Sequence, residues 1–210
     1  MASATSAKSP LFPVQQGHLA RLQDGLDFVN TLHLSPLHDH LDSPASALEW
    51  LAGHNLMHRE ARDNLLEQLR RSPEKAPRVL GRVHRARAAL RGVLEATAAR
   101  RPSDPSDLAE LNRALRAYYV YELVPAPDGV TLEHRHHGDP VEGAIARLVE
   151  SVARELIQGH PERLRVCQNE ECRWVFADAS RTGQRKWCSM SSCGNRAKVA
   201  RFRARQRAMS

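Results

Sequence analysis

All four cysteines of the 210-residue chain lie between positions 167 and 193. They form two pairs with the spacing C-x4-C, separated by fifteen residues: Cys167, Cys172, Cys188 and Cys193. Zn²⁺ prefers four thiolates in a tetrahedron, and two short loops that each supply two thiolates reach that geometry without strain. A segment this short cannot bury an adequate core, so metal binding would supply its folding energy. We therefore expect one structural zinc ion at these four cysteines.

Two other uses of the cysteines fit less well. Paired disulfides are typical of secreted proteins, but the N-terminal MASATSAKSP lacks the apolar stretch of a signal peptide. A redox pair usually has two residues between its cysteines rather than four. No apolar run approaches the length of about 18 residues that suggests a membrane span. We expect a cytoplasmic chain with a disordered leader over residues 1–16 and no membrane partner.

The net charge of +7 is concentrated at the C-terminal end. Residues 160–210 contain 12 Lys and Arg against 4 Asp and Glu, whereas residues 1–159 contain 19 against 20. A near-neutral body with a basic end is typical of a nucleic-acid-binding appendage. A solvated charged helix would give the same counts, so charge alone leaves both interpretations open.

The first 160 residues have the pattern of a helical domain. Aromatic residues are only 5% of the chain, and the dominant Ala, Leu, Arg and Glu favour helices. Two shorter helices are expected after the caps Ser43 and Ser103 or Asp104, each next to a proline. Apolar residues recur at helical spacing in four longer segments: 17–34, 54–70, 76–100 and 140–159.

One hairpin interrupts this helical pattern. β-Favouring runs flank Pro127-Asp128-Gly129, a strong turn signal. After it, helical spacing places Ile145, Leu148, Val149, Val152, Leu156 and Ile157 on one face. The expected fold is therefore α+β and mainly helical. Residues 17–160 form a helical domain with one β-hairpin, and residues 161–210 form the four-cysteine module and a basic helix.

The residues around the cysteines predict a compact module. Trp174, Phe176 and Trp187 would give the metal site an apolar shell, and Gly194 permits close backbone approach. Asp178 would pair with an arginine and orient it. Asn195 is expected to support the module structurally, whereas Arg196 could support it or read a base.

The last helix places its cations in two rows. At 100° per residue, Lys198, Arg201 and Arg205 form one row, and Arg196, Arg203 and Arg207 form the other. Val199 and Phe202 form a narrow apolar stripe that we expect to pack on the module. The opposite sector contains only alanines, which could approach a DNA groove or another protein surface. The expected nucleic-acid contacts are Arg181, Arg185, Lys186, Arg196, Lys198, Arg201, Arg203 and Arg205.

Two stretches resemble known families. The run CQNEECRWVFADASRTGQRKWCSMSSCGNRAKVARFRAR resembles the CGNR zinc finger, through Phe176, Asp178, Ser180-Arg181, Arg185 to Met190, and Cys193-Gly194-Asn195-Arg196. GLDFVNTLH and DHLDSPASALEWL resemble the opening of the ABATE domain, which accompanies this finger in bacterial proteins. The resemblance implies a bacterial, stress-related transcription regulator whose finger binds DNA.

The expected function is therefore DNA-binding transcription regulation. One finger buries little DNA, so we expect a homodimer on double-stranded DNA, with the N-terminal domain serving dimerisation or small-molecule sensing. An RNA-binding protein and a protein-interaction adaptor are the alternatives.

Enzyme activity is not expected, because the chain has neither a phosphate-binding loop nor a nucleophile elbow. A pocket where Asp24, Asp27 and His33 converge would favour an enzyme. The histidine-rich stretches 38–40 and 134–137 are interpreted as surface histidines.

Overall fold

The structure, a computed structural model, describes residues 22–116, 119–136 and 138–208, so the expected leader over 1–16 lies outside it. The helices are α1 (Leu22–Val29), α2 (Pro44–Gly53), α3 (Arg59–Arg71), α4 (Ala76–Ala98), α5 (Pro105–Ala114), α6 (Pro140–Gln158) and α7 (Asn195–Ala208). The strands are β1 (Leu32–Leu34), β2 (Leu37–Asp39), β3 (Tyr119–Ala126), β4 (Gly129–His136), β5 (Leu164–Val166) and β6 (Val175–Ala177). The strands pair in chain order into three antiparallel hairpins. The mainly helical α+β fold is confirmed.

Short polar side chains begin three of the helices. The Ser43 hydroxyl accepts from the Ser46 N–H, and the Ser46 hydroxyl accepts from the Ser43 N–H, which completes a capping box at α2. The Asp104 carboxylate accepts from the Ser106 N–H at the start of α5, and the Asp139 carboxylate accepts from the Val141 and Glu142 N–H groups at the start of α6. These side chains bind first-turn N–H groups that have no partner within the helix.

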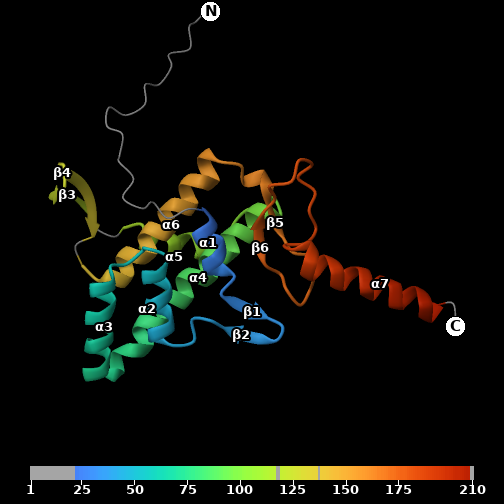
Figure 1. Cartoon of the computed structure of the whole chain (residues 1–210), viewed down its shortest axis with the longest axis horizontal. Coiled ribbons are helices and arrows are strands. Elements are labelled where there is room, and N and C mark those ends of the chain that lie inside the picture. Colours follow the sequence, from blue (N-terminus) through green and yellow to red (C-terminus); the bar gives the residue numbers. More distant parts are fainter. Residues whose placement is uncertain (1–21, 117–118, 137, 209–210) are drawn as a thin grey trace, which may run out of the picture.

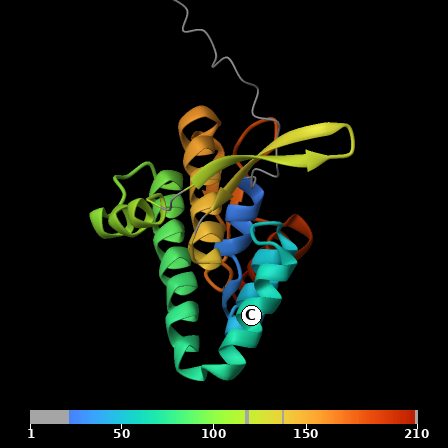
Figure 2. The ribbon, with the colours of Figure 1, turned by 90° about the vertical axis from the view of Figure 1, so that its left-hand side faces the viewer.

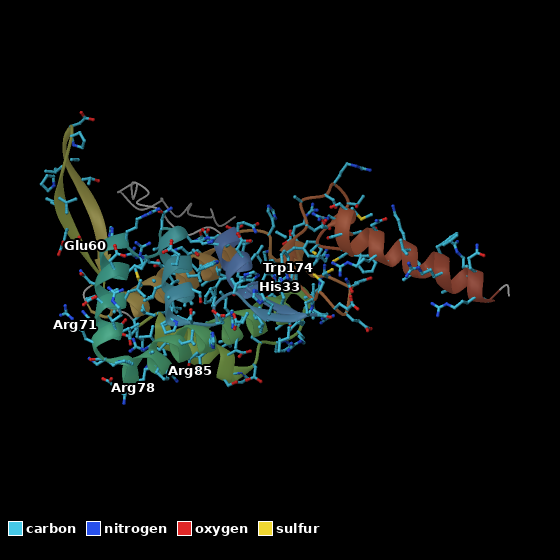
Figure 3. All side chains as sticks on the ribbon, turned by 60° about the horizontal axis from the view of Figure 1, so that its bottom comes forward. His33, Glu60, Arg71, Arg78, Arg85 and Trp174 are labelled. Carbon is cyan, nitrogen blue, oxygen red and sulfur yellow. The ribbon has the colours of Figure 1, made fainter. Side chains whose placement is uncertain are left out.

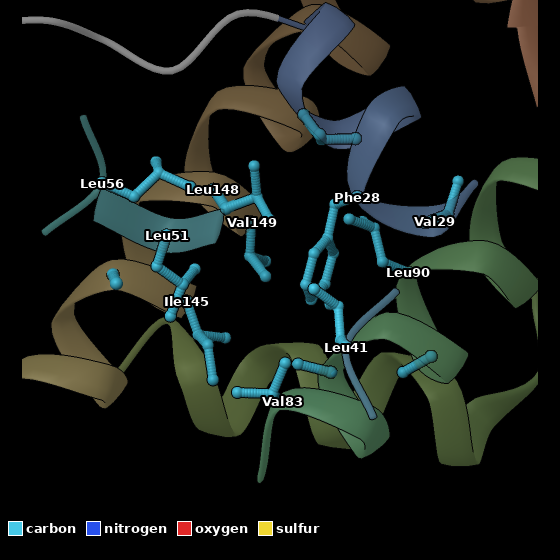
Figure 4. Packing of buried hydrophobic residues seen from close by; sticks show 14 of the residues in the cluster. Phe28, Val29, Leu41, Leu51, Leu56, Val83, Leu90, Ile145, Leu148 and Val149 are labelled. Carbon is cyan, nitrogen blue, oxygen red and sulfur yellow. The ribbon is translucent and has the colours of Figure 1, made fainter. Parts of the chain in front are cut away.

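The core lies where α1, α2, α4 and α6 meet. Figure 4 shows their apolar side chains facing one another, with Phe28 among residues from the other elements. Phe28, Leu51, Leu90 and Leu148 are all almost completely buried. This packing accounts for the helical spacing in the sequence.

The first helix is shorter than its apolar spacing predicts. It ends at Val29, and residues 32–34, expected to be helical, form a hairpin with residues 37–39. Thr31 donates both its N–H and its hydroxyl to the Phe28 carbonyl. In a continuing helix, the Leu32 N–H would donate to that carbonyl instead. The helical prediction is therefore wrong for residues 32–34.

The prediction for the apolar face of α6 is also wrong at one residue. Ile145, Leu148, Val149 and Val152 are buried, but Ile157 is 82% exposed. At 100° per residue, Ile157 lies about 120° around the helix from Ile145. It therefore points away from the core.

The predicted hairpin at Pro127-Asp128-Gly129 is confirmed. β3 and β4 pair from Tyr119↔His136 to Ala126↔Gly129, so Pro127 and Asp128 form the turn. Gly129 has a φ of +134°, which a residue with a side chain rarely adopts. Figure 2 shows this ribbon standing out from the helices.

The cysteine module packs against the helical domain and is not connected to it by the chain alone. Leu164 and Val175 of its hairpin are buried in the same core as the helices. The buried Asn30 side chain donates to the Val175 carbonyl over 2.8 Å and accepts from its N–H over 3.0 Å. Arg91 of α4 donates to the Arg173 carbonyl over 2.7 Å.

These contacts orient the two ends of the molecule. In Figure 1, α7 extends away from the body on one side, and the β3–β4 ribbon lies at the opposite end. Within the described residues, no helix combines the length and apolar character needed to cross a bilayer.

Candidate metal centre and nucleic-acid interface

The four cysteines converge on one point. Their Sγ atoms all lie within 4.8 Å of one another. Two of the separations are 3.6 Å, between Cys172 and Cys188, and 3.8 Å, between Cys188 and Cys193. Four sulfurs at about 2.3 Å from a tetrahedral zinc ion would be about 3.8 Å apart. The geometry therefore fits a closed four-thiolate metal site.

Without a cation, this cluster disfavours thiolates. Burial is the main cause that raises the pKa of Cys172 to about 11, although a hydrogen bond with Cys188 acts against it. Burial and the neighbouring thiols Cys172 and Cys167 also raise the pKa of Cys188. At Cys193 burial acts in the same direction, but hydrogen bonds from Asn169 and the other thiols outweigh it and lower the pKa. A divalent cation would offset the repulsion among four thiolates, so the ligand set suits zinc in charge as well as geometry.

Backbone hydrogen bonds hold the two cysteine loops in place. The Cys167 N–H donates to the Trp174 carbonyl over 2.8 Å, and the Gln168 N–H donates to the Lys186 carbonyl over 2.9 Å. Phe176, Trp174 and Trp187 pack against the cysteines. A Cβ on Gly194 would lie 2.9 Å from the Met190 Sδ and 3.3 Å from Trp187. That tight approach suits a glycine.

The buried carboxylate of Asp178 organises the loop between the cysteine pairs. It accepts from the Ser180 N–H over 2.9 Å and from the Arg185 N–H over 2.8 Å. Burial alone would raise its pKa, but these hydrogen bonds and the Ser180 hydroxyl lower it to about 2. The carboxylate is therefore ionised and fixes the loop. Its contact with Arg185 is to the backbone, not to the guanidinium.

Three arginines hold the same loop by its carbonyl groups. Arg163 donates to the Ser180 carbonyl and Arg165 to the Gly183 carbonyl, each over 2.7 Å. Arg185 donates to the Cys188 carbonyl over 2.6 Å, and its guanidinium lies 5.1 Å from the centre of the Phe176 ring. Neither Arg163 nor Arg165 could be predicted from the sequence, because no local pattern marks an arginine that binds distant carbonyls.

The remaining cationic candidates are exposed. Arg181 and Lys186 lie on the loop, and Arg196 forms a long, exposed ion pair of 3.7 Å with Glu171. Asn195, the first residue of α7, is also exposed. The exposed cations of α7 are Arg196, Lys198, Arg201, Arg203, Arg205 and Arg207.

The apolar stripe of α7 does not pack on the module, contrary to the prediction. Val199 is 41% exposed and Phe202 is 55% exposed. The helix contacts the preceding turn, Met190–Gly194, and then extends into solvent. Of the fourteen residues of α7, only Ala197 is partly buried.

The other polar candidates do not converge on one pocket. Asp24 lies 3.0 Å from His54, which stacks on Trp50. Asp27 accepts from Gln23. His33 instead packs beside Trp174 of the module, as Figure 3 shows, with ring centres 5.4 Å apart.

Of the two histidine-rich stretches, the structure describes the side chains of 38–40 but not those of 134–137. His38 and His40 are exposed, and their rings contact each other and His33.

Comparisons with known families agree with this arrangement. The CGNR zinc finger model matches residues 163–206, which include all four cysteines and most of α7. The ABATE model, described as "Putative stress-induced transcription regulator", matches residues 25–160. A search of curated proteins found no match. The chain therefore belongs to the ABATE family and carries a CGNR zinc finger after its ABATE domain.

Proposed function

We propose that this protein is a DNA-binding transcription regulator in which one structural zinc ion fixes the finger and α7 contacts double-stranded DNA. The observation that carries the proposal is the state of α7. It projects from the body, and all six of its cations are exposed. A helix of this width fits the major groove of B-DNA.

The metal site would set the direction of this helix. Cys193 is two residues before Asn195, where α7 begins. The turn between them is closed by the Gly194 N–H, which donates to the Ser189 carbonyl over 3.0 Å. Because Cys193 is one of the four sulfurs, a bound zinc ion would fix the first turn of α7 relative to the body.

The two rows of cations would reach phosphates on either side of a groove. One row, with Ala204, surrounds an open hollow on the side of α7: Lys198, Arg201, Ala204 and Arg205. The exposed alanines between the rows would let the helix approach closely. Arg181 and Lys186 would add phosphate contacts from the loop. Arg185, already bound to Cys188 and Phe176, would support the loop instead.

The test replaces one cationic row with alanine: Lys198→Ala, Arg201→Ala and Arg205→Ala together. We expect the affinity for duplex DNA to fall at least about tenfold, because each lost phosphate contact weakens binding. The slope of log K against log salt should fall by about one for each lost contact. Binding is measured by fluorescence anisotropy at several salt concentrations.

A matched triple variant controls for net charge. Arg70→Ala, Arg71→Ala and Arg78→Ala remove three cations from α3 and α4, at the end of the body away from α7, where Figure 3 labels Arg71 and Arg78. If both triples weaken binding equally, the helix is not the contact surface. Preference for structured RNA over the duplex would support the RNA alternative. A protein captured through the finger without a DNA footprint would support the adaptor alternative.

We also propose that a second copy covers the β3–β4 ribbon. An isolated two-stranded ribbon is at best marginally stable in water. Leu123 and Val130 share one of its faces and are 70% and 71% exposed. One finger alone would bury little DNA, and pairing at the ribbon would leave both copies of α7 free at the opposite ends.

Charge on that face should therefore separate the copies. We expect Leu123→Lys to convert a dimer into a monomer in analytical ultracentrifugation, because a lysine cannot be buried there without a partner. Thr131→Lys, on the other face of the ribbon, should leave the dimer intact. A wild-type monomer, or a dimer unaffected by Leu123→Lys, would contradict this interface.

The N-terminal domain would also bind a small-molecule effector under this proposal, and the whole regulator would act in the cytoplasm. An effector must bind two states of the domain with different affinity. It should raise the melting temperature in a thermal-shift screen and change DNA affinity. If no metabolite raises the melting temperature or changes DNA affinity, dimerisation would be the only role proposed for the domain.

A further inference from the structure

An open cleft reaches the sulfur cluster from one side. Its volume is about 240 Å³, and three of the four thiols, Cys172, Cys188 and Cys193, line it. The opposite wall comes from the ABATE domain, through His33, Leu34 and Ser35 of the β1–β2 hairpin. Figure 3 places His33 and Trp174 side by side at this junction. Small molecules can therefore reach the cluster through a cleft whose two walls belong to different domains.

The four thiols differ in how well a reagent can reach them. Cys167 is 0% exposed and Cys193 is 2% exposed, whereas Cys172 and Cys188 are half-buried. The Asn169 amide also donates to the Cys193 Sγ over 3.5 Å, so this buried sulfur already has a partner. With zinc bound all four sulfurs would be thiolates, so exposure decides which of them a reagent reaches first. Cys172 and Cys188 are thus the reactive pair.

These two sulfurs are also placed to join each other. They lie 3.6 Å apart, on different cysteine loops. A disulfide requires about 2.05 Å, so each sulfur would move by less than 1 Å (about 0.8 Å) toward the other. Ser192 and Arg196 line the same cleft, so their side chains could donate hydrogen bonds to a departing oxygen.

We propose that Cys172 and Cys188 are an oxidation site for hydroperoxides, at which a disulfide forms and the zinc ion is released. One thiolate attacks the peroxide, the O–O bond breaks, and a sulfenic acid and hydroxide form. The second thiolate attacks that sulfur, and a second hydroxide leaves. Two thiolates lose two electrons and hydrogen peroxide gains them. Cys167 and Cys193 would then be the only thiolates left, too few to hold the ion in a four-thiolate site. This inference rests on the metal site of the proposed function.

The β1–β2 hairpin should control the rate of this reaction. Leu34 lines the cleft, whereas Leu37, its partner in the hairpin register, does not. Leu34→Trp would fill part of the cleft, and Leu37→Trp adds the same side chain outside it. Both positions are exposed, so neither change disturbs the core.

The experiment treats the zinc-loaded, full-length protein with hydrogen peroxide. Zinc release is followed with a colorimetric chelator, and the first disulfide is identified by peptide mass spectrometry. We expect one zinc ion released for each Cys172–Cys188 disulfide. Leu34→Trp should slow release about fivefold relative to Leu37→Trp, because it restricts access to both thiols.

Each contrary outcome has a distinct meaning. Protein purified without zinc, and unable to take it up, would overturn the metal site and this inference with it. Zinc-loaded protein in which Cys167 or Cys193 enters the first disulfide would overturn the oxidation site alone. The oxidation site would also be overturned if zinc stayed bound in the presence of peroxide, or if Leu34→Trp and Leu37→Trp released zinc at equal rates.

Discussion

Replacing Cys188 with serine is expected to abolish zinc binding and specific DNA binding while leaving the helical domain folded. Loss of one of four thiolates opens the closed tetrahedral site, so the variant should not retain zinc after dialysis. The helical core contains no thiol, and Leu164 and Val175 of the module belong to that core. The ABATE domain and β5–β6 should therefore persist, and only the loops around the cysteines and the start of α7 should lose order.

Hydrogen exchange at single backbone amides can distinguish the cysteine loops, which should lose order, from the part that should stay folded. The Gln168 N–H donates to the Lys186 carbonyl across the cysteine loops and should lose its protection in Cys188→Ser. The Asp178 N–H donates to the Arg163 carbonyl beside β6 and should keep it. Far-UV circular dichroism should remain close to that of the wild type. Global unfolding of Cys188→Ser would show that zinc stabilises the whole chain, contrary to this account.

Replacing Asp39 with alanine is expected to cost about 3 kcal/mol of unfolding free energy, because it leaves a buried guanidinium without its counterion. The Arg87 side chain is only 6% exposed. Its two terminal nitrogens bind the two Asp39 oxygens over 2.5 and 2.6 Å. A third contact, of 3.0 Å, joins Arg87 to the Thr31 hydroxyl. Urea unfolding of the zinc-loaded protein measures the effect.

Replacing Arg87 instead of Asp39 should cost less unfolding free energy. Arg87→Met removes the buried charge and keeps most of the side-chain volume, and Asp39, 23% exposed, can still be hydrated. We expect a loss of about 1 kcal/mol. Equal losses for the two variants would contradict this asymmetry.

The ion pair also predicts a pH dependence. The hydrogen bond from Arg87 holds the pKa of Asp39 below its usual value despite partial burial. The pair therefore stabilises the fold above the unfolded pKa of about 3.9, and this contribution is lost as the pH falls through the lower folded pKa. In the Cys188→Ser background, which removes the pH dependence of zinc binding, the cost of Asp39→Ala should shrink as the pH is lowered from 6 to 3.

Local chemistry made several features predictable from the sequence. The spacing of the cysteines predicted four sulfurs at one point, and these sulfurs lie within 4.8 Å of one another. Ser43 before Pro44 predicted the start of α2. The turn signal at Pro127-Asp128-Gly129 predicted the β3–β4 ribbon. Each of these depends on residues close together in the chain or on the geometry that a metal requires.

Contacts between distant residues explain what the sequence did not predict. Asn30 binds the backbone of Val175, which is 145 positions away, and this contact joins the finger to the ABATE domain. Arg87 binds Asp39 across 48 positions and fixes the β1–β2 hairpin, whose first strand was predicted to be helical from apolar spacing alone. Phe202 shows the converse error, because its helical spacing predicted a packed face and its side chain is instead 55% exposed.

The central claim is that a zinc-held finger directs α7 to specific DNA sequences. Its most direct test is retention of genomic DNA fragments by the zinc-loaded protein at two salt concentrations, followed by sequencing. We predict a common, symmetric sequence that disappears with Cys188→Ser and with the Lys198, Arg201 and Arg205 triple variant. Retention without any shared sequence, falling steeply with salt and unaffected by zinc, would contradict the claim.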